Sequence, residues 1–96
     1  MSNAMKKAEK VCTCLKWISH PTRLAILMEL KQGPRSVGEL VERLDFASQS
    51  NVSQHLSQMR SCGIVSSRRD GAQIFYEAAD RRLFQFLDLL GELFCK

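Results

Sequence analysis

The sequence predicts a mainly α-helical domain that carries a β-hairpin, in the order helix, helix, helix, helix, strand, strand, helix. Five segments place apolar residues at the spacing of an amphipathic helix. Two short strand-like runs, 64–69 and 72–76, flank Asp70-Gly71, a dipeptide typical of a tight hairpin turn. The helix before this hairpin has a polar outer side, and the hairpin is basic. Together they suit a DNA groove and its flanking phosphates.

The first two helices are predicted over 6–18 and from Pro21 to Leu30. The first has an apolar residue at every third or fourth position, namely Ala8, Val11, Leu15 and Ile18. Pro21 suits the first turn of a helix, because the N–H that proline lacks has no partner there. Gly33-Pro34 ends the second helix, with glycine as the cap and proline as the breaker.

A capping box opens the third helix. In the segment 36–39, the Ser36 hydroxyl and the Glu39 carboxylate can each accept from a backbone N–H at the helix start. The buried stripe of this helix comprises Val37, Leu40, Val41 and Leu44. A turn over 45–49 follows, in which we expect Phe46 to plug the core and Ser48 or Ser50 to cap the next helix.

The fourth helix, over about 50–61, separates its apolar from its polar side chains. At about 100° per residue, Val52, Leu56 and Met59 lie within a narrow arc. The opposite side carries Ser50, Ser53, Gln54 and Ser57. His55 lies on the flank of the apolar stripe, and we expect it at the edge of the core, hydrogen-bonded or in contact with a phosphate rather than binding a metal.

The last helix, over 80–94, has more apolar surface than one domain needs. Its apolar residues cover well over half the circumference, whereas packing on one face needs a stripe of roughly 100°. They are Leu83, Phe84, Phe86, Leu87, Leu89, Leu90, Leu93 and Phe94. The surplus predicts a homodimer that packs through the first and last helices.

Length and composition limit the remaining possibilities. We expect residues 1–4 to be an expression scar and 5–96 to form one domain, with dimerisation helices at 6–18 and 80–94. No apolar run approaches the roughly 20 residues of a bilayer span, so we expect no membrane partner and a cytoplasmic protein. A net charge of +4 permits nucleic-acid binding. The four cysteines, in a reducing compartment, argue against a disulfide framework.

These elements resemble the ArsR/SmtB family of bacterial winged-helix regulators. The matching segments are 20–27, 36–40, 52–56 and 63–65, together with the Arg68-Arg69-Asp70-Gly71 wing. The resemblance runs from about residue 8 to the end. It implies a dimeric winged helix-turn-helix protein that binds double-stranded operator DNA, usually as a repressor released by an inducer. The turn before the fourth helix looks one residue longer than the family pattern, which makes contacts at 49–51 less secure than those at Ser53 and Gln54.

The predicted DNA-binding residues lie on the fourth helix and the wing. Glutamine and asparagine side chains can pair with adenine edges, serines can reach bases or phosphates, and arginines can bind phosphates. The residues are Gln49, Ser50, Asn51, Ser53, Gln54 and Ser57 on the helix, and Arg68, Arg69 and Gln73 on the wing. The alternative is an ordinary solvated helix face beside a charged hairpin tip.

The cysteines suggest a sensor without defining one. The family commonly binds metals through a Cys-x-Cys pair in the third helix, but residues 38–42 contain no thiol. The C-terminal end resembles the family's haemolysin-activator and sulfide-sensing subgroup, whose helix-two cysteine is Met28 here. A rewired thiol or soft-metal site using Cys12, Cys14 and Cys95 remains open, and no metal site is certain. The alternative is that Cys14 is a core thiol on the buried stripe, with Cys12 at its edge. Cys62 is expected to be structural.

Three classes of function follow. The favoured one is a sequence-specific transcriptional regulator, most simply a dimeric repressor, with the helix at about 50–61 in the major groove and the wing at about 64–77 on the backbone. A thiol modification or a soft metal ion would be its inducer. The second class is a winged-helix module for protein contacts, and the third is an enzyme or metal-handling protein. Within the first class, a regulator that senses neither thiols nor metals is the alternative. The sequence has no Gly-rich phosphate loop, paired-carboxylate pocket or nucleophile-base set, which argues against an enzyme.

Overall fold

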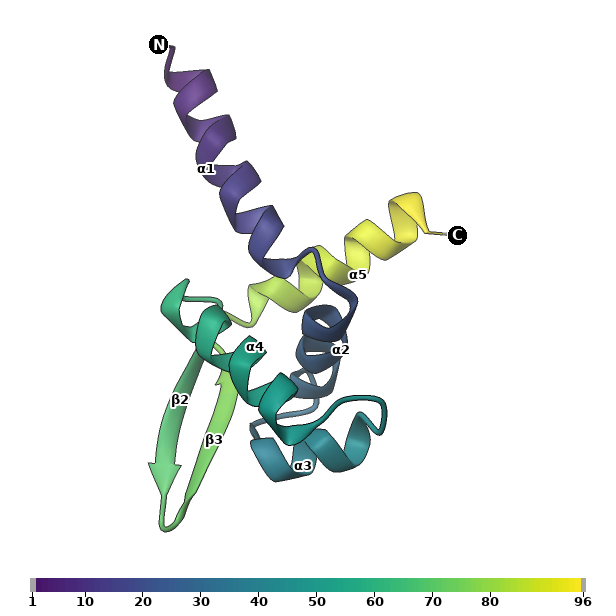
Figure 1. Ribbon diagram of the computed structural model, residues 1–96. Coiled ribbons are helices and arrows are strands. Elements are labelled where there is room, and N and C mark those ends of the chain that lie inside the picture. Colours follow the sequence, from purple (N-terminus) through teal and green to yellow (C-terminus); the bar gives the residue numbers. More distant parts are fainter. Residues whose placement is uncertain (1, 96) are drawn as a thin grey trace.

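The computed structural model of the chain describes residues 2–95 and has the predicted mainly helical fold with a β-hairpin (Figure 1). The elements are α1 (Asn3–Ile18), α2 (Pro21–Leu30), β1 (Arg35–Ser36), α3 (Val37–Arg43), α4 (Gln49–Ser61), β2 (Val65–Asp70), β3 (Gln73–Ala78) and α5 (Arg82–Phe94). Helices α2, α3 and α4 pack together, and the hairpin of β2 and β3 extends away from them. The predicted fold class is therefore confirmed.

Three helix starts follow the local chemistry of the sequence. The His20 side chain accepts a hydrogen bond from the Thr22 backbone N–H at 3.1 Å, and Pro21 occupies the first turn of α2. The capping box of α3 is present, with Ser36 and Glu39 bonded reciprocally at 3.2 Å. The backbone N–H of Ser36 lowers the pKa of the Glu39 carboxyl group. Ser48 caps α4, because its hydroxyl accepts from the Asn51 N–H at 3.1 Å.

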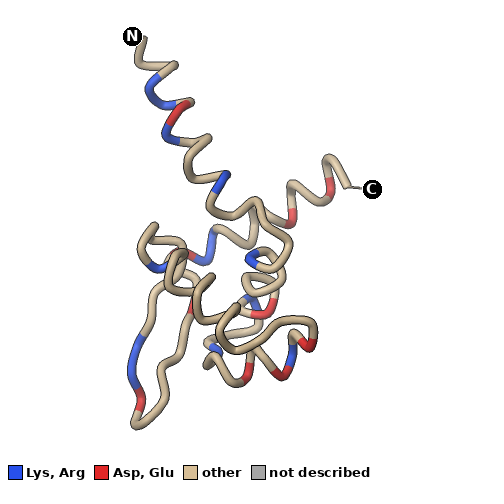
Figure 2. The backbone as a smooth tube through the Cα atoms, in the orientation of Figure 1, with Lys and Arg blue, Asp and Glu red and all other residues tan. Residues whose placement is uncertain are grey.

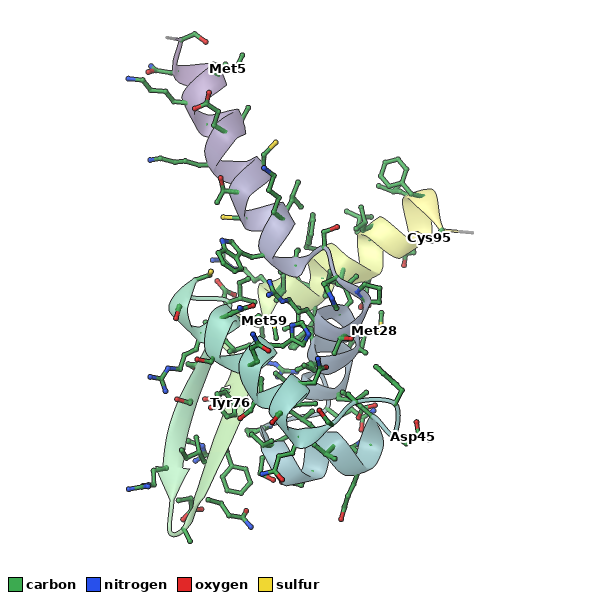
Figure 3. All side chains as sticks on the ribbon, in the orientation of Figure 1. Met5, Met28, Asp45, Met59, Tyr76 and Cys95 are labelled. Carbon is green, nitrogen blue, oxygen red and sulfur yellow. The ribbon has the colours of Figure 1, made fainter. Side chains whose placement is uncertain are left out.

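The core lies where α2, α3 and α4 meet the sheet. Its largest fully buried side chains are Ile26, Leu27, Leu30, Leu40, Val52, Leu56, Met59 and Val65. From the wing, Tyr76 belongs to the same buried cluster as Met59 of α4; both are labelled in Figure 3. Burying one such side chain contributes about 1.5–3 kcal/mol, so this cluster fixes the position of α4.

The sheet contains a strand that the sequence did not predict. The strand order is β1-β3-β2, all antiparallel, with Arg35 opposite Tyr76 and Ser36 opposite Phe75. A strand of two residues has no periodicity to detect, because the alternation of side chains only shows over a longer run. This short pairing attaches the beginning of α3 to the base of the wing.

The hairpin turn lies one residue later than predicted. Asp70 pairs with Gln73, so the loop is Gly71 and Ala72 rather than Asp70 and Gly71. Gly71 has φ +66°, a conformation that glycine adopts without steric cost. The wing therefore covers 65–78 instead of 64–77.

The turn before α4 also differs from the prediction. Phe46 is 65% exposed and does not plug the core; the smaller Ala47 is buried there instead, at 8% exposure. Gln49 is already helical, so α4 begins one residue before the predicted residue 50. The larger side chain faces solvent because the buried Leu44 and Ala47 set which side of the turn faces inward.

The first and last helices also begin elsewhere than predicted. Helix α1 starts at Asn3 rather than residue 6, because the Ser2 hydroxyl accepts from the Met5 N–H. Helix α5 starts at Arg82 rather than residue 80, and the Asp80 side chain accepts from the Arg82 N–H at 2.9 Å. The predicted ends at Ile18 and Phe94 are correct.

Helices α1 and α5 diverge from the body of the molecule (Figure 1). In α1 only Ile18 is buried, and in α5 only Phe84. Their exposed large apolar residues are Met5, Val11, Leu15, Trp17, Phe86, Leu89, Leu90, Leu93 and Phe94. The prediction that Cys14 shares a buried stripe with Val11 and Leu15 is wrong for the single chain, because all three are exposed. None of the helices within residues 2–95 is long and apolar enough to cross a membrane.

Candidate nucleic-acid interface

All nine side chains predicted to contact DNA are solvent-exposed. The six on α4 are Gln49, Ser50, Asn51, Ser53, Gln54 and Ser57, and the three on the wing are Arg68, Arg69 and Gln73. Exposure is what groove contacts require, since base edges and phosphates must be reached without disturbing the core.

The polar face of α4 is a direct consequence of how the helix is anchored. Val52, Leu56 and Met59 are buried on one side, which turns Ser53 and Gln54 toward solvent on the other. The serine side chains are short, so they leave the helix backbone free to approach a groove closely. By helical spacing, Asn51 lies nearer the flank that carries His55 than the centre of this face.

A hollow of about 350 Å³ separates α4 from the wing. Gln49 and Ser53 line it from α4, and Gln73 lines it from the wing. Its third side is the start of α3, at Ser36, Val37 and Gly38. The structure thus brings together three predicted site residues from two elements around one open, polar recess.

The two wing arginines point to opposite faces of the hairpin. Arg69 lies opposite Ile74 and Arg68 opposite Phe75, and side chains alternate along a strand. Ile74 and Tyr76 line the hollow beside α4, so Arg69 shares that face while Arg68 takes the outer one. Figure 2 shows this positive charge along β2. The ion pairs found among residues 2–95 do not involve either arginine.

Arg60 is a further candidate residue of this surface, which the sequence analysis did not include. Its Nη1 donates to the Ser67 hydroxyl at 3.1 Å, which ties the end of α4 to β2. The side chain is exposed and positively charged, close to the hairpin base. A signal was available, because Ser53, Ser57 and Arg60 follow one another at the spacing of a single helix face.

Arg23 connects α4 to α1 and α2. Its Nε donates to Nδ1 of His55 at 3.0 Å, its Nη1 to the Trp17 carbonyl oxygen at 2.8 Å, and its Nη2 to the Gln58 side-chain oxygen. Its guanidinium group also lies over the Trp17 ring, 5.3 Å from the centroid. The orientation of α4 is therefore held by one cation as well as by the core.

His55 is a hydrogen-bonded residue at the edge of the core, as predicted. Its ring lies 4.6 Å from the His20 ring, and its Nδ1 accepts from Arg23. Burial lowers the pKa of His55, and the nearby charges of His20 and Arg23 lower it further. The neutral form, which can accept at Nδ1, is the one that this arrangement stabilises.

The three cysteines considered as a sensor are not brought together in one chain. Cys12, Cys14 and Cys95 are all free and exposed. Cys95 lies at the far end of α5, which diverges from α1 (Figure 3). In the part of the chain that the structure describes, no three potential ligands from His, Cys, Asp and Glu lie close enough to hold a metal ion. Cys62 was expected to be structural, but its side chain is exposed.

Comparison with known proteins identifies the family to which this chain is similar. The family model described as bacterial regulatory protein, arsR family, matches residues 20–67. The biofilm growth-associated repressor of Agrobacterium fabrum is 41% identical over 90 residues, which cover 94% of this chain and 76% of that protein. The chain belongs to the ArsR family. The prediction made from the sequence motifs is confirmed.

Solved structures of ArsR-family regulators agree over nearly the whole chain. Reduced HlyU from Vibrio cholerae superimposes with a TM-score of 0.84 at 34% identity, covering 100% of both chains. A homodimeric winged helix-turn-helix DNA-binding domain from Mycobacterium bovis gives a TM-score of 0.81 at 26% identity, covering 96% of this chain and 88% of that one. With its family and its relatives established, this chain is a DNA-binding transcription regulator.

Proposed function

We propose that two copies of this chain pack through α1 and α5 and bind operator DNA, with α4 of each copy in the major groove. The observation that carries the proposal is the exposed polar face of α4, placed across one hollow from a basic wing. This arrangement offers base contacts from a helix and phosphate contacts from a hairpin. The alternative, a winged-helix module for protein contacts, leaves the wing arginines without a role.

The apolar faces of α1 and α5 support the dimer. Leu15 and Ile18 of α1 face Phe86 and Leu90 of α5 across an apolar hollow of about 270 Å³. Farther along α5, Leu89, Leu93 and Phe94 are more than half exposed. A second copy is the simplest cover for such a surface, and the Mycobacterium bovis neighbour is described as homodimeric.

On this arrangement Gln54 reads a base edge and the serines around it support close approach. A glutamine amide can pair with the N6 and N7 atoms of adenine, whereas Ser53 and Ser57 reach bases or phosphates. Gln49, Ser50 and Asn51 lie at the start of the helix, where contacts to bases or the nearest phosphates are made. Arg69 and Gln73 contact the backbone across the hollow, and Arg68 contacts it from the outer face.

Repression follows most simply from occupancy. A dimer bound over a promoter excludes other proteins from the same DNA, and the Agrobacterium fabrum relative is named a repressor. Such a protein acts where the chromosome lies, which in a bacterium is the cytoplasm. We also propose that residues 5–96 act as a single unit in this function.

The test is DNA binding as a function of salt. Fluorescence anisotropy should compare a duplex from the region upstream of the protein's own gene with a shuffled duplex of equal composition. We expect the upstream duplex to bind about a thousandfold or more tightly, with affinity falling as salt rises. The wing variant Arg68→Ala/Arg69→Ala should bind both duplexes more weakly, whereas Arg43→Ala on α3 serves as the control that removes a positive charge elsewhere. Equal, salt-independent affinity for both duplexes would favour the protein-contact module.

A further inference from the structure

A small hollow at the junction of α1 and α4 holds two thiols. It measures about 210 Å³ and is lined by Thr13, Cys14 and Trp17 from α1 and by Cys62 and Ile64 from the segment that follows α4. Both cysteines are free and exposed. They are far apart in the sequence, so the fold alone brings them to the same space.

Helix geometry places only one of the two α1 thiols at this hollow. Trp17 lies four residues after Thr13 and three after Cys14, so it is a helical neighbour of both and links them into one wall of the hollow. Cys12 lies roughly 200° around the helix from Cys14 and so faces away. The apolar stripe of Val11, Leu15 and Ile18 is centred on a different side from Thr13 and Trp17. The side of the hollow formed by Thr13 and Trp17 therefore lies outside the stripe that a second copy would cover, whereas Cys14 lies at the edge of that stripe.

Both thiols lie next to anchored backbone. Cys14 is one helical turn from Ile18, the buried residue of α1. Cys62 caps α4, with its N–H bonded to the Gln58 carbonyl oxygen, and precedes Gly63 at φ +78°. A disulfide needs Cα atoms within about 4.4–6.8 Å. Because α1 buries only Ile18 on its own chain, the oxidation would proceed through a rotation of α1 about that point that brings the two Cα atoms within this range.

We propose that Cys14 and Cys62 form a dithiol pair that a peroxide oxidises to an intramolecular disulfide. One thiolate attacks the peroxide oxygen, giving a sulfenic acid and releasing hydroxide, or alkoxide from an organic peroxide. The second thiol then attacks the sulfenic sulfur, forms the S–S bond and releases water. The two thiols together lose two electrons and two protons, and the peroxide O–O bond receives the electrons.

The bond would join α1 directly to the end of α4. The same hollow is walled by Trp17, whose carbonyl and ring both contact Arg23. Arg23 in turn bonds His55 and Gln58 of α4. Oxidation would thus fix the angle between α1 and α4 at the value that the disulfide requires, in place of the angle that these contacts set in the reduced protein. Formation of this disulfide needs no bound DNA.

The experiment treats the full-length reduced protein with hydrogen peroxide and maps its disulfides by peptide mass spectrometry without reduction. We expect free thiols to fall from four to two and the monomer mass to fall by that of two hydrogen atoms. The linked peptides should contain Cys14 and Cys62. Fluorescence of Trp17, the single tryptophan, should be quenched by the adjacent disulfide and restored by dithiothreitol.

Matched variants separate this pair from the other thiols. Cys12→Ser, on the opposite side of the same helix, and Cys95→Ser should still form the bond and lose fluorescence. Cys14→Ser and Cys62→Ser should form no such disulfide, and their tryptophan fluorescence should not fall on peroxide treatment. If Cys62 of the wild-type protein stays free after peroxide treatment, or is linked to Cys12 or Cys95 as often as to Cys14, the proposal is wrong. The mapping of the wild type does not depend on any variant folding, and neither outcome bears on DNA binding.

Discussion

At the scale of single residues, Arg23 and His55 determine how α4 is held. Arg23 can donate to His55 only while Nδ1 of the imidazole carries no proton. Protonation would remove this acceptor and place a second positive charge beside the guanidinium group. The contact between α2 and α4 therefore contains a titratable group whose pKa is lowered from its usual value of 6.5, chiefly by burial.

This contact predicts a pH dependence of stability. Because the pKa of His55 is lowered in the folded chain, the unfolded chain takes up its proton first as pH falls through the usual value of 6.5. The free energy of unfolding should therefore decrease below that pH and level off once folded His55 is also protonated. Thermal melts across this range should show the decrease, and it should shrink in His55→Asn, whose side-chain oxygen accepts without titrating. Identical pH profiles for the two proteins would exclude His55 as the source.

Gln54 should affect the choice of DNA sequence far more than the stability of the fold. It is exposed on the outer face of α4, so Gln54→Ala should change stability by no more than about 0.5 kcal/mol. Removing its bond to a base should cost about 1–3 kcal/mol of discrimination between the preferred duplex and one altered at the recognised base pair. Competition binding with single-base-pair variants measures this directly, and Gln85→Ala on α5 is the control. Equal weakening on every duplex would assign Gln54 to the phosphates.

At the scale of elements, the wing and α4 form one surface because three strands and a helix end hold them together. β1 pairs with β3 at the start of α3, and Arg60 bridges α4 to Ser67 on β2. The wing is thus fixed at its base and free only at its tip. The side chains of Arg68 and Arg69 point to opposite faces of the hairpin, so the two residues cannot have equivalent roles.

The wing arginines should contribute unequally to DNA binding. We expect Arg69→Ala to weaken binding more than Arg68→Ala, because Arg69 is on the face that shares the hollow with α4. Each variant should weaken binding to all DNA sequences to a similar extent. Each should also flatten the slope of log affinity against log salt by roughly 0.9 for every phosphate that is no longer neutralised. Affinity measured at several salt concentrations checks both statements. A larger effect from Arg68 would place the DNA backbone on the outer face of the hairpin.

Strong local patterns made most elements predictable. The capping box at Ser36, the proline at the start of α2 and the inner stripe of α4 each depend on residues a few positions apart. Phe46 and β1 were not predictable in this way. Phe46 faces solvent because Leu44 and Ala47 already fill the space beneath the turn, and β1 exists only because β3 pairs with it. The strand β1 depends on a distant part of the chain, and the position of Phe46 depends on which residues of the turn reach the core, which local spacing does not decide.

The same limit applies to the candidate site. The outer face of α4 could be predicted residue by residue, since helical spacing alone defines it. Adjacent residues of a strand face opposite sides, so the sequence predicts that Arg68 and Arg69 diverge, but which of the two faces α4 depends on how the hairpin packs against that helix. The hollow shared by Cys14 and Cys62 required the packing of α1 against the end of α4. The family resemblance had instead left open a site that combines Cys14 with Cys12 and Cys95.

At the scale of the whole molecule, the chain is elongated, with principal extents of 48 × 31 × 21 Å, because α1 and α5 project from the body. Their apolar faces remain uncovered in one copy. In a dimer, the packing of α1 and α5 against the second copy would set the distance between the two α4 helices. That distance would in turn set the spacing of the two half-sites on DNA.

An acidic residue in this surface should separate the copies. Leu90 lines the apolar hollow between α1 and α5, so Leu90→Asp would place an unpaired carboxylate in the proposed interface. We expect monomers in analytical ultracentrifugation and weaker binding to the upstream duplex, because the two half-sites are no longer engaged as one unit. Gln85→Asp, on the polar strip of the same helix, should leave both properties unchanged. A Leu90→Asp protein that remains dimeric would move the interface away from this face.

The slight anchoring of α1 has a consequence for how much regulator a cell needs. A helix of 16 residues that buries only Ile18 on its own chain is marginal in water, so its ordering and the pairing of copies become a single coupled step. The population of pairs then grows with the square of the free-monomer concentration. Occupancy of the promoter would therefore rise steeply with the concentration of the protein. At low expression the promoter would stay unbound, and a modest rise in synthesis would be enough for dimers to occupy it.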